Sequence, residues 1–559
     1  MRRVIAPFSS LAFVVAVALA AAAQTAPPPG TPSPLPPAAS PGGPSAATTP
    51  APSPGEAPTE APTPTPPPYL FAPTPPPIIV EPPEVGVEPG KTATARINSV
   101  LGTVAVTVAD PTVATAVVDQ LQRVLFVTGV KLGTTTITLT DSRGVTRDVP
   151  VRVAYAAGSA PDETSLRITG NSASAAFVRE AIAAAVERAV TLRPGASVNV
   201  NPDGVPVRRE LHLDDRLAVD VPVTIAGDGY FTVNGNTHVI VENVALPPIE
   251  PARLLVSDYP ERLTANGVLF TARLDRTQAQ RFLYYHFNPG NEPPRRILLK
   301  AYNSSNAPAV VQLIDGSAGP GVNEMEVGHL STRRFLVQQA RNEGLVITVP
   351  PGATVNLVDH PLPPQNIVSA ILQLRLVTGD PLDLALVAQD ANAPLDQSAD
   401  VTQLLAGGVP HARGVYPVPT FYFERTYDVD GDDLEIPIGQ LPLPNLRQGE
   451  ALGGDYGVEQ SMNVVIVNMT RGPHPIALYA NPRGGRATGT FIIDGTLVQA
   501  HALPPFSKFK LWQETIAPGT FRRIRIVTMP EGGSSYPLRL IFAPDDGSVA
   551  PGAPGSLIY

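Results

Sequence analysis

The 559-residue chain contains no cysteine, and it is poor in aromatic residues (6%) and in charged residues (16%). Without cysteine the protein has no disulfide, no thiolate metal site, no cysteine nucleophile and no cysteine-linked lipid anchor. The chain is mildly acidic, with a net charge of −9, and it has no block of clustered lysine and arginine. Because phosphate binding needs such a block, we expect no nucleic-acid partner.

Apolar residues, in contrast, are abundant enough to build several hydrophobic cores. They make up 43% of the chain, and this chain length allows about three or four domains of the usual size. Proline is also abundant, at 66 residues, and most of the excess lies near the N-terminus. The composition therefore predicts a multidomain protein preceded by a proline-rich segment.

The N-terminus has the pattern of a signal peptide. Arg2 and Arg3 precede an apolar run from Leu11 to Ala22, and small residues follow before Gln24. This pattern predicts a signal peptide over residues 1–23, since the run is short for a membrane anchor of about 20 residues. No later segment has a long uninterrupted apolar run. We therefore expect a mature chain without a transmembrane segment, exported to the periplasm, the cell surface or the extracellular space.

The segment 24–80 is rich in proline, alanine and threonine and has almost no large apolar side chains. Such a segment buries too little surface to offset its ordering entropy, so we predict a disordered linker. Two interpretations remain open. The prolines favour an extended conformation, which suits a spacer that carries the folded domains through the cell wall, and the alternative is a passive linker.

Residues 81–156 show the alternation of apolar and polar residues that is typical of strands. Strand-like segments at 104–108, 124–128 and 134–140 are separated by turn residues such as Asp110 and Pro111. Seven short strands at this spacing predict a β-sandwich.

The same residues carry a family resemblance. Residues 110–114 (DPTVA) and 127–136 (VTGVKLGTTT) are similar to the pattern of bacterial Ig-like group-2 domains. The N-terminal domain of pilus-assembly secretins has nearly the same pattern. The resemblance implies an Ig-like fold, an exported location and partners among pilus or secretion proteins. Nothing downstream resembles the pore-forming domain of a secretin, so we do not expect a pore.

Residues 163–247 predict a small α+β domain. A strand at 165–170 is followed by Asn171, Ser172 and Ser174, any of which can cap a helix. The helix runs to about Val190, with apolar residues recurring every four positions at Val178, Ile182 and Val186. A strand at 197–200 completes a β-α-β unit that resembles the BON-type domain following the N-terminal domain in secretins. The Asn234-Gly235 step further along predicts a hairpin turn.

Residues 252–390 and 408–545 resemble two divergent copies of one β-sandwich domain. The first copy contains RILLKAYN from Arg296, and the second contains HPIALYAN from His474 at the equivalent place. Each then has an Ile-Asp-Gly turn, a Pro-Pro step and two closing strands in the same order. We interpret the two regions as a duplication, followed by a flexible tail over residues 546–559.

The first copy has an insertion at 317–344 with helical character. Ser331 or Thr332 is the expected N-cap, and Gly344 is the expected stop. One interpretation is a partner-binding insertion that uses Arg333, Arg334 and Arg341. The alternative is a helix that closes an open end of the sandwich, with Phe335 and Leu336 on its core face.

The densest acidic cluster lies at residues 428–435. It offers four aspartate carboxylates to a calcium ion, from Asp428, Asp430, Asp432 and Asp433. Calcium takes six to eight oxygen ligands, but the glycine and glutamate of an EF-hand loop are not in place here. A solvated acidic turn is the simpler interpretation, with calcium as the alternative, and we expect no other cofactor.

No catalytic motif is recognisable. Asp359-His360 is the single adjacent acid–imidazole pair, and it has no nucleophile motif beside it. Tyr284 and Tyr422 belong to aromatic clusters that could stack on sugars, although aromatic residues in strands more often pack in a core. We therefore do not expect an enzyme.

The sequence thus predicts a mainly β, multidomain protein. It combines Ig-like β-sandwiches with one small α+β domain and a disordered proline-rich linker. The expected function is a structural, adhesive or pilus/secretion-associated scaffold of the cell envelope. Two alternatives remain, a cell-wall or carbohydrate-binding protein and a secreted hydrolase with an unrecognised site.

Overall fold

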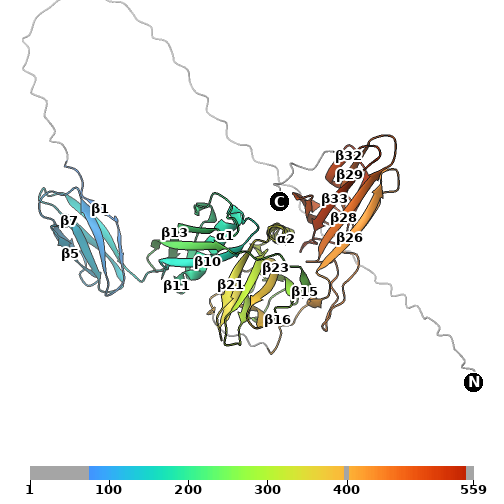
Figure 1. Ribbon diagram of the computed structural model, residues 1–559. Helices are drawn as coiled ribbons and strands as arrows, with labels where there is room; N and C mark the ends of the chain where they lie inside the picture. The colour runs from blue at the N-terminus through green and yellow to red at the C-terminus, as the bar shows by residue number, and fades with distance from the viewer. Residues whose placement is uncertain (1–74, 396–401, 549–559) are drawn as a thin grey trace, which may run out of the picture. The chain divides into compact units, whose positions relative to one another are not determined.

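A computed structural model describes residues 75–395 and 402–548 of the chain. The signal peptide predicted at 1–23, most of the linker predicted at 24–80 and most of the tail lie outside these ranges. The described residues are mainly β, in several sandwich-like units with two α-helices (Figure 1). The predicted fold class is therefore confirmed.

Residues 79–153 form a sandwich of two four-stranded sheets, with strand orders β1-β3-β6-β5 and β2-β8-β7-β4. Alternate residues along the strands, such as Leu125 and Ile137, are fully buried between the sheets. The strands are β1 (Ile79–Glu81), β2 (Val85–Val87), β3 (Thr92–Asn98), β4 (Ala105–Val108), β5 (Ala114–Asp119), β6 (Val124–Gly129), β7 (Gly133–Thr140) and β8 (Thr146–Val153).

The first strand of this sandwich, β1, was not expected from the sequence. It begins inside the segment predicted as linker, because Ile78 and Val80 are buried in the core of the sandwich. Prolines on both sides of this short apolar stretch obscure its strand pattern in the sequence. The sandwich therefore has eight strands where the sequence pattern predicts seven.

The α+β domain follows. Ser174 caps α1 by accepting a hydrogen bond from the Phe177 amide, and Val178, Ile182 and Val186 are fully buried, as their spacing predicts. The elements are β9 (Gly158–Ser159), β10 (Glu163–Thr169), α1 (Ala175–Ala189), β11 (Thr191–Leu192), β12 (Ala196–Asn199), a 3-10 turn (Pro202–Gly204), β13 (Arg216–Gly227) and β14 (Val233–Asn243).

The turn predicted at Asn234-Gly235 is wrong. These residues lie within β14, paired with Thr224 and Val223 of β13. The hairpin turns earlier, where Gly229 has a φ of 83° that glycine adopts without strain. A hydrogen bond of 3.0 Å from the Thr224 hydroxyl to the Asn234 side-chain oxygen helps to keep this step in the ladder.

The first large sandwich has a main sheet with the order β21-β19-β23-β17-β15-β25 and a second sheet with the order β16-β24-β18-β22. Its elements are β15 (Pro251–Ser257), β16 (Gly267–Leu274), β17 (Ala279–Phe287), β18 (Arg295–Tyr302), β19 (Ala309–Asp315), β20 (Ala318–Gly321), α2 (Glu324–Arg341), β21 (Gly344–Val349), β22 (Thr354–Leu362), β23 (Ile367–Thr378), β24 (Leu382–Asp390) and β25 (Arg413–Tyr416).

The main sheet does not end at the sandwich. Strand β10 of the α+β domain pairs with β21, so that one 11-stranded sheet runs from β12 to β25. Buried side chains reinforce this junction. The Thr169 hydroxyl donates to the Asn342 carbonyl at 2.8 Å, and the Gln312 amide donates to Thr169 at 2.9 Å.

The second large sandwich repeats the strand pairing of the first. Its sheets have the orders β31-β30-β33-β28-β26 and β27-β34-β29-β32, and β26 runs parallel to β28 as β15 runs parallel to β17. The duplication remains a prediction, which this correspondence supports. The strands are β26 (Thr420–Asp428), β27 (Leu434–Ile438), β28 (Glu459–Asn468), β29 (His474–Pro482), β30 (Ala487–Ile493), β31 (Thr496–Leu503), β32 (Phe509–Ile516), β33 (Thr520–Thr528) and β34 (Leu538–Pro544).

The boundary between the two copies lies later than position 408, where the sequence placed it. Strand β25 pairs antiparallel with β15, so residues 413–416 belong to the first large sandwich. The reason is burial, since Val415 and Tyr416 fill the edge of that sandwich.

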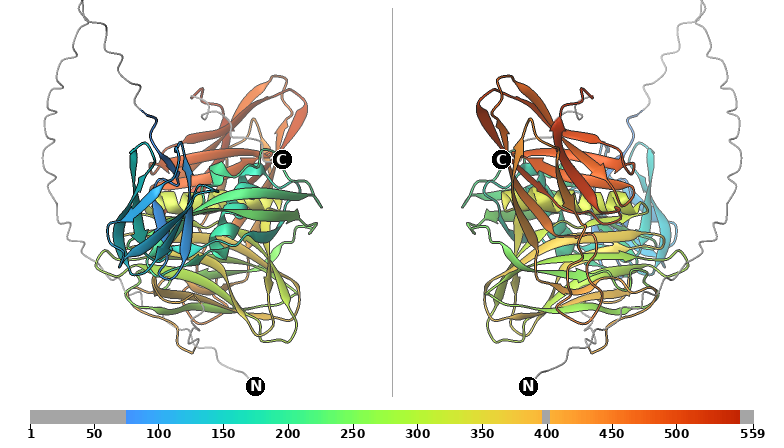
Figure 2. Two further views of the ribbon diagram at one scale, coloured as in Figure 1. Left: turned by 90° about the vertical axis from the view of Figure 1, so that its left-hand side faces the viewer. Right: turned by 90° about the vertical axis from the view of Figure 1, so that its right-hand side faces the viewer.

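Helix α2 also begins earlier than predicted. Its N-cap is Asn323, whose side chain accepts a hydrogen bond from the Glu326 amide, while Ser331 and Thr332 are buried inside the helix. It ends at Asn342 in the left-handed conformation, two residues before the predicted stop. Figure 2 shows the helix, in yellow, between strands of the first large sandwich and the orange and red strands of the second large sandwich.

Candidate functional site

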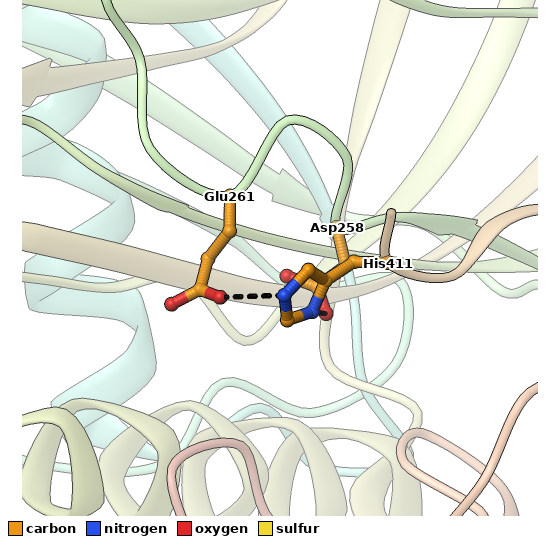
Figure 3. A group of neighbouring side chains, drawn as sticks. All are labelled: Asp258, Glu261 and His411. Carbon is orange, nitrogen blue, oxygen red and sulfur yellow. Dashed lines mark ion pairs between the residues drawn. The ribbon is translucent and has the colours of Figure 1, made fainter. Parts of the chain in front are cut away.

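Three residues that could ligate a metal ion meet beside the edge of the first large sandwich (Figure 3). Asp258 follows directly after β15, and Glu261 lies in the same loop. His411 comes from a distant part of the chain, shortly before β25. Because Ser257 of β15 lies opposite Arg413 of β25, the antiparallel pairing brings His411 to the two carboxylates.

The imidazole of His411 lies between the two acids. Its Nδ1 is 3.5 Å from Oδ2 of Asp258, and its Nε2 is 3.2 Å from Oε2 of Glu261. One ligand atom from each of the three residues lies within 4.8 Å of the other two. About a third or less of each acidic side chain is exposed, at 27% for Asp258 and 33% for Glu261.

Burial and charge act on this cluster in opposite directions. Burial raises the pKa of Asp258 to about 6, although the hydrogen bond to His411 opposes this shift. The hydrogen bond to Asp258 raises the pKa of His411 above its usual value. Oδ1 of Asp258 is buried and has no hydrogen-bond partner within the described part of the chain. The cluster therefore contains a buried carboxylate oxygen that no hydrogen-bond donor of the described chain compensates.

A second polar cluster joins α2 to the second large sandwich. Nδ1 of His329 is 3.0 Å from a carboxylate oxygen of Glu531, and its Nε2 is 3.1 Å from the side-chain oxygen of Gln499. Burial alone would lower the pKa of His329, but the hydrogen bond and charge of Glu531 outweigh burial and raise it. Thr490 donates a further hydrogen bond of 2.7 Å to Glu531. This arrangement stabilises an imidazolium–carboxylate pair inside the protein.

A third cluster joins β17 to the second large sandwich. Arg281 is fully buried, and its guanidinium lies 3.1 Å from the Glu459 carboxylate. The side-chain amide of Gln339, on α2, donates to the same carboxylate at 2.9 Å. Apolar side chains surround these groups, including Phe335 and Leu336 of α2. The two sandwiches and α2 thus share one interface, which is both apolar and ionic.

The predicted calcium ligands lie elsewhere. Asp428, Asp430, Asp432 and Asp433 are all exposed, at and after the end of β26. Across residues 75–395 and 402–548, the structure gathers three metal-ligating groups within ligand spacing at Asp258, Glu261 and His411, and not among these four aspartates. Calcium binding at the acidic turn remains a prediction.

The predicted partner-binding arginines make contacts within the chain. Arg341 forms ion pairs with Glu343, at 3.0 Å, and with Glu210 of the α+β domain. Arg334 is exposed and donates to the Ser317 carbonyl at 2.8 Å, while Arg333 is partly buried. Partner binding by these residues remains a prediction, but the contacts of Arg341 tie α2 to the α+β domain.

The remaining residues singled out in the sequence divide into buried and exposed. Tyr284 is fully buried, 3.0 Å from Nδ1 of His360, so it cannot stack on a sugar. Asp359 makes two hydrogen bonds with Arg296, at 2.9 and 2.8 Å, and does not orient His360. Tyr422 on β26 is 67% exposed and remains available for stacking.

Sequence reasoning missed Asp258, Glu261 and His411. The carboxylates are ordinary loop residues, and the histidine is far from them in the sequence. Only the pairing of β15 with β25 brings them together, and no local pattern signals that pairing.

Neither of the two helices in the described residues is long and apolar enough to cross a membrane.

Solved structures give weak similarities. Domains 5-6 of the S-layer protein SbsC are 18% identical, covering 30% of this chain and 97% of that chain, with a TM-score of 0.14. A structure of carbohydrate-binding modules from the beta-sandwich super family is 8% identical, and the match covers 56% of this chain and 97% of that chain with a TM-score of 0.16. SGBP-B of Bacteroides ovatus, in complex with a mixed-linkage heptasaccharide, is 13% identical. The match covers 52% of this chain and 71% of that chain, with a TM-score of 0.10. These scores are too low to indicate a shared overall fold.

The comparison with protein families is more specific. A search of curated proteins gave no match. The family described as the pilus formation protein N terminal region, however, matches residues 81–154, which form the first sandwich. The resemblance of the DPTVA and VTGVKLGTTT segments to the N-terminal domain of pilus-assembly secretins is confirmed. Residues 81–154 are therefore similar to the pilus formation protein N terminal region, and this similarity covers the first of the described domains.

Proposed function

We propose that the protein is an exported, non-enzymatic scaffold of the bacterial envelope that works with a pilus or secretion apparatus. The observation that carries this proposal is the match of residues 81–154 to the pilus formation N-terminal family. In this proposal that domain makes the contact with the apparatus. The α+β domain and the two large sandwiches form the body of the scaffold.

The contacts between the domains support a scaffold rather than a set of independent modules. One sheet continues from the α+β domain into the first large sandwich. Helix α2 then contacts strands of both large sandwiches through buried side chains. Extensive buried contacts of this kind hold neighbouring domains in fixed positions, as a structural protein requires.

Site-specific photo-crosslinking in cells tests this proposal. A crosslinking residue at Val117, which is 68% exposed on the first sandwich, should capture a pilus or secretion component. The matched control position is Phe521, which is 65% exposed on the second large sandwich and should not capture that component. If several exposed positions within residues 81–154 capture no component of such an apparatus, the proposal is wrong.

Glycan binding is a second candidate function, favoured by one observation. Tyr422 is 67% exposed on the edge strand β26, between Phe421 and Phe423, whose rings are 6.1 Å apart. Exposed aromatic rings can bind the apolar faces of sugars. Binding of the purified protein to peptidoglycan and to soluble glycans should then be saturable and lost in Tyr422→Ala. The control Phe521→Ala should bind normally, and equal binding by both variants would exclude this site.

A further inference from the structure

We propose that Asp258, Glu261 and His411 bind one divalent transition-metal ion, with zinc as the expected class. The basis is geometric. Two carboxylates and one imidazole place a ligand atom each within 4.8 Å of the others, at a partly exposed position that an ion can reach. The two carboxylates contact different ring nitrogens of His411, so one of the three side chains would have to rotate for both carboxylates to share an ion on a single nitrogen.

The charge of the cluster favours a cation. Among the described residues, neither Asp258 nor Glu261 forms an ion pair with lysine or arginine, and His411 is their shared partner. With a neutral imidazole the three groups carry two negative charges. Oδ1 of Asp258 is also buried without a hydrogen bond in the resolved ranges. A buried carboxylate oxygen of this kind is costly unless a donor or a cation compensates it.

The backbone presents the three ligands in a defined arrangement. The Asp258 amide donates to the Ala412 carbonyl at 3.0 Å, which fixes the loop directly beside His411. The Phe287 amide donates to the Glu261 carbonyl at 2.8 Å. Between the two acids, the carbonyl of Tyr259 accepts a hydrogen bond of 3.1 Å from Arg413. A site held in this way loses little entropy when the ion binds.

The ligand set distinguishes between metals. Imidazole with carboxylates suits zinc, whereas calcium prefers six to eight oxygen ligands and magnesium avoids nitrogen. Three protein ligands leave the fourth position of a tetrahedral ion to water. Since the chain has no cysteine, any tight zinc site in it must use histidine and carboxylate ligands. Bound zinc would attach the segment before β25 to the first large sandwich. The chain continues from this segment through β25 into the second large sandwich.

Calorimetry on the metal-free full chain tests the proposal directly. We expect one equivalent of Zn²⁺ to bind to the wild-type protein. Co²⁺ should give visible absorption bands, which report inner-sphere ligands. The variants Glu261→Gln and His411→Gln should bind Zn²⁺ at least about tenfold more weakly, a loss of about 1.4 kcal/mol or more, and should lose the Co²⁺ bands.

A matched control is available in the same chain. His238 pairs with Asp220 at 2.8 Å but has no third ligand beside it, so His238→Gln should leave Zn²⁺ binding unchanged. Glu261→Gln is the safer of the two test variants, because the partly exposed Glu261 carboxylate forms an ion pair with His411 and with no other side chain of the described residues. Circular dichroism verifies that both variants are folded.

Three other outcomes would contradict the proposed metal site. No Zn²⁺ binding by the wild-type protein at micromolar concentrations would overturn the proposal. Equal binding by the folded Glu261→Gln variant would assign the ion to another place. Tighter binding of Ca²⁺ than of Zn²⁺ would show that the imidazole is not a ligand.

Discussion

Arg281 and Glu459 form a charged pair where water has little access. The arginine is fully buried, and the carboxylate is held at 3.1 Å by the guanidinium and at 2.9 Å by the Gln339 amide. Placing such a pair inside a protein is not necessarily stabilising, because both charges lose their hydration. Removing one partner, however, leaves the other charge buried without compensation.

Arg281→Met should therefore destabilise the protein by about 3–5 kcal/mol, because the buried Glu459 carboxylate loses its cation. The double variant Arg281→Met/Glu459→Gln should recover part of this loss. Equilibrium denaturation in urea measures both. A cost below about 1 kcal/mol for the single variant would show that water reaches the pair.

Asp455 is a second residue with an unfavourable charge. It is buried in the left-handed conformation with a φ of 55°, and its Oδ2 accepts a hydrogen bond of 3.1 Å from the Gly439 amide. Burial outweighs this hydrogen bond and raises the pKa of Asp455 to about 6. Its Oδ1 is among the buried atoms without a partner in the described ranges.

Asp455→Asn should stabilise the protein at pH 8 by about 1–2 kcal/mol, after allowing for the unpaired amide. Asparagine also tolerates the left-handed conformation. The pKa of Asp455 is higher in the folded state than in the unfolded state. Its charge therefore lowers the stability of the folded state above pH 6 and has no effect on stability once both states are protonated. The gain should thus disappear as the pH falls from 6 toward 4. Thermal denaturation across this range checks the sign, and a gain that grows at low pH would contradict it.

At the scale of secondary structure, α2 is the element that connects the most parts of the molecule. It contacts the second large sandwich through His329 and Gln339, the first through Phe335, and the α+β domain through Arg341. Its connection through His329 depends on pH, because the ion pair with Glu531 exists only while the imidazole is protonated.

The raised pKa of His329 gives the direction of this dependence. The contribution of the ion pair is complete below about pH 6.5 and is lost as the pH rises through the raised value. We expect the stability of the wild-type protein to fall by about 1–3 kcal/mol from pH 6 to pH 9 through this pair. His329→Gln should remove that slope. If denaturation midpoints of wild type and variant keep the same pH dependence, His329 is not the titrating group.

The two helices differ in how well the sequence predicts them. For α1 the apolar spacing and the Ser174 cap both point to the observed limits. For α2 the start was missed, although Asn323 with Glu326 three residues later resembles a capping box. Gly328 weakens the helical pattern there, and its reason is tertiary, since a Cβ atom would come within 2.5 Å of the Gly532 carbonyl carbon. Close backbone contact between distant segments has no local sequence signal.

At the scale of the whole molecule, the buried contacts divide the described chain into two unequal stability units. The first sandwich has its own hydrophobic core. The α+β domain and the two large sandwiches are joined by a continuous sheet and by the interface around α2. Domains that share so much buried surface unfold together.

We therefore expect calorimetry to show two transitions, one for residues 79–153 and one for residues 158–548. Gly328→Ala should weaken the contact of α2 with the loop at Gly532 by about 1–3 kcal/mol and split the larger transition. Gly472→Ala is the control, because a Cβ atom there meets no atom within 4 Å. Four independent transitions in the wild-type protein would contradict this description.

The pairing of β25 with β15 has a consequence for limited proteolysis. The first large sandwich completes its main sheet with residues 413–416, which lie beyond the chain segment 396–401. A cut in that segment would therefore separate the chain covalently without separating the domains. Both fragments should elute together from a sizing column under native conditions and come apart only in denaturant, so the protein could lose chain continuity there and keep its architecture.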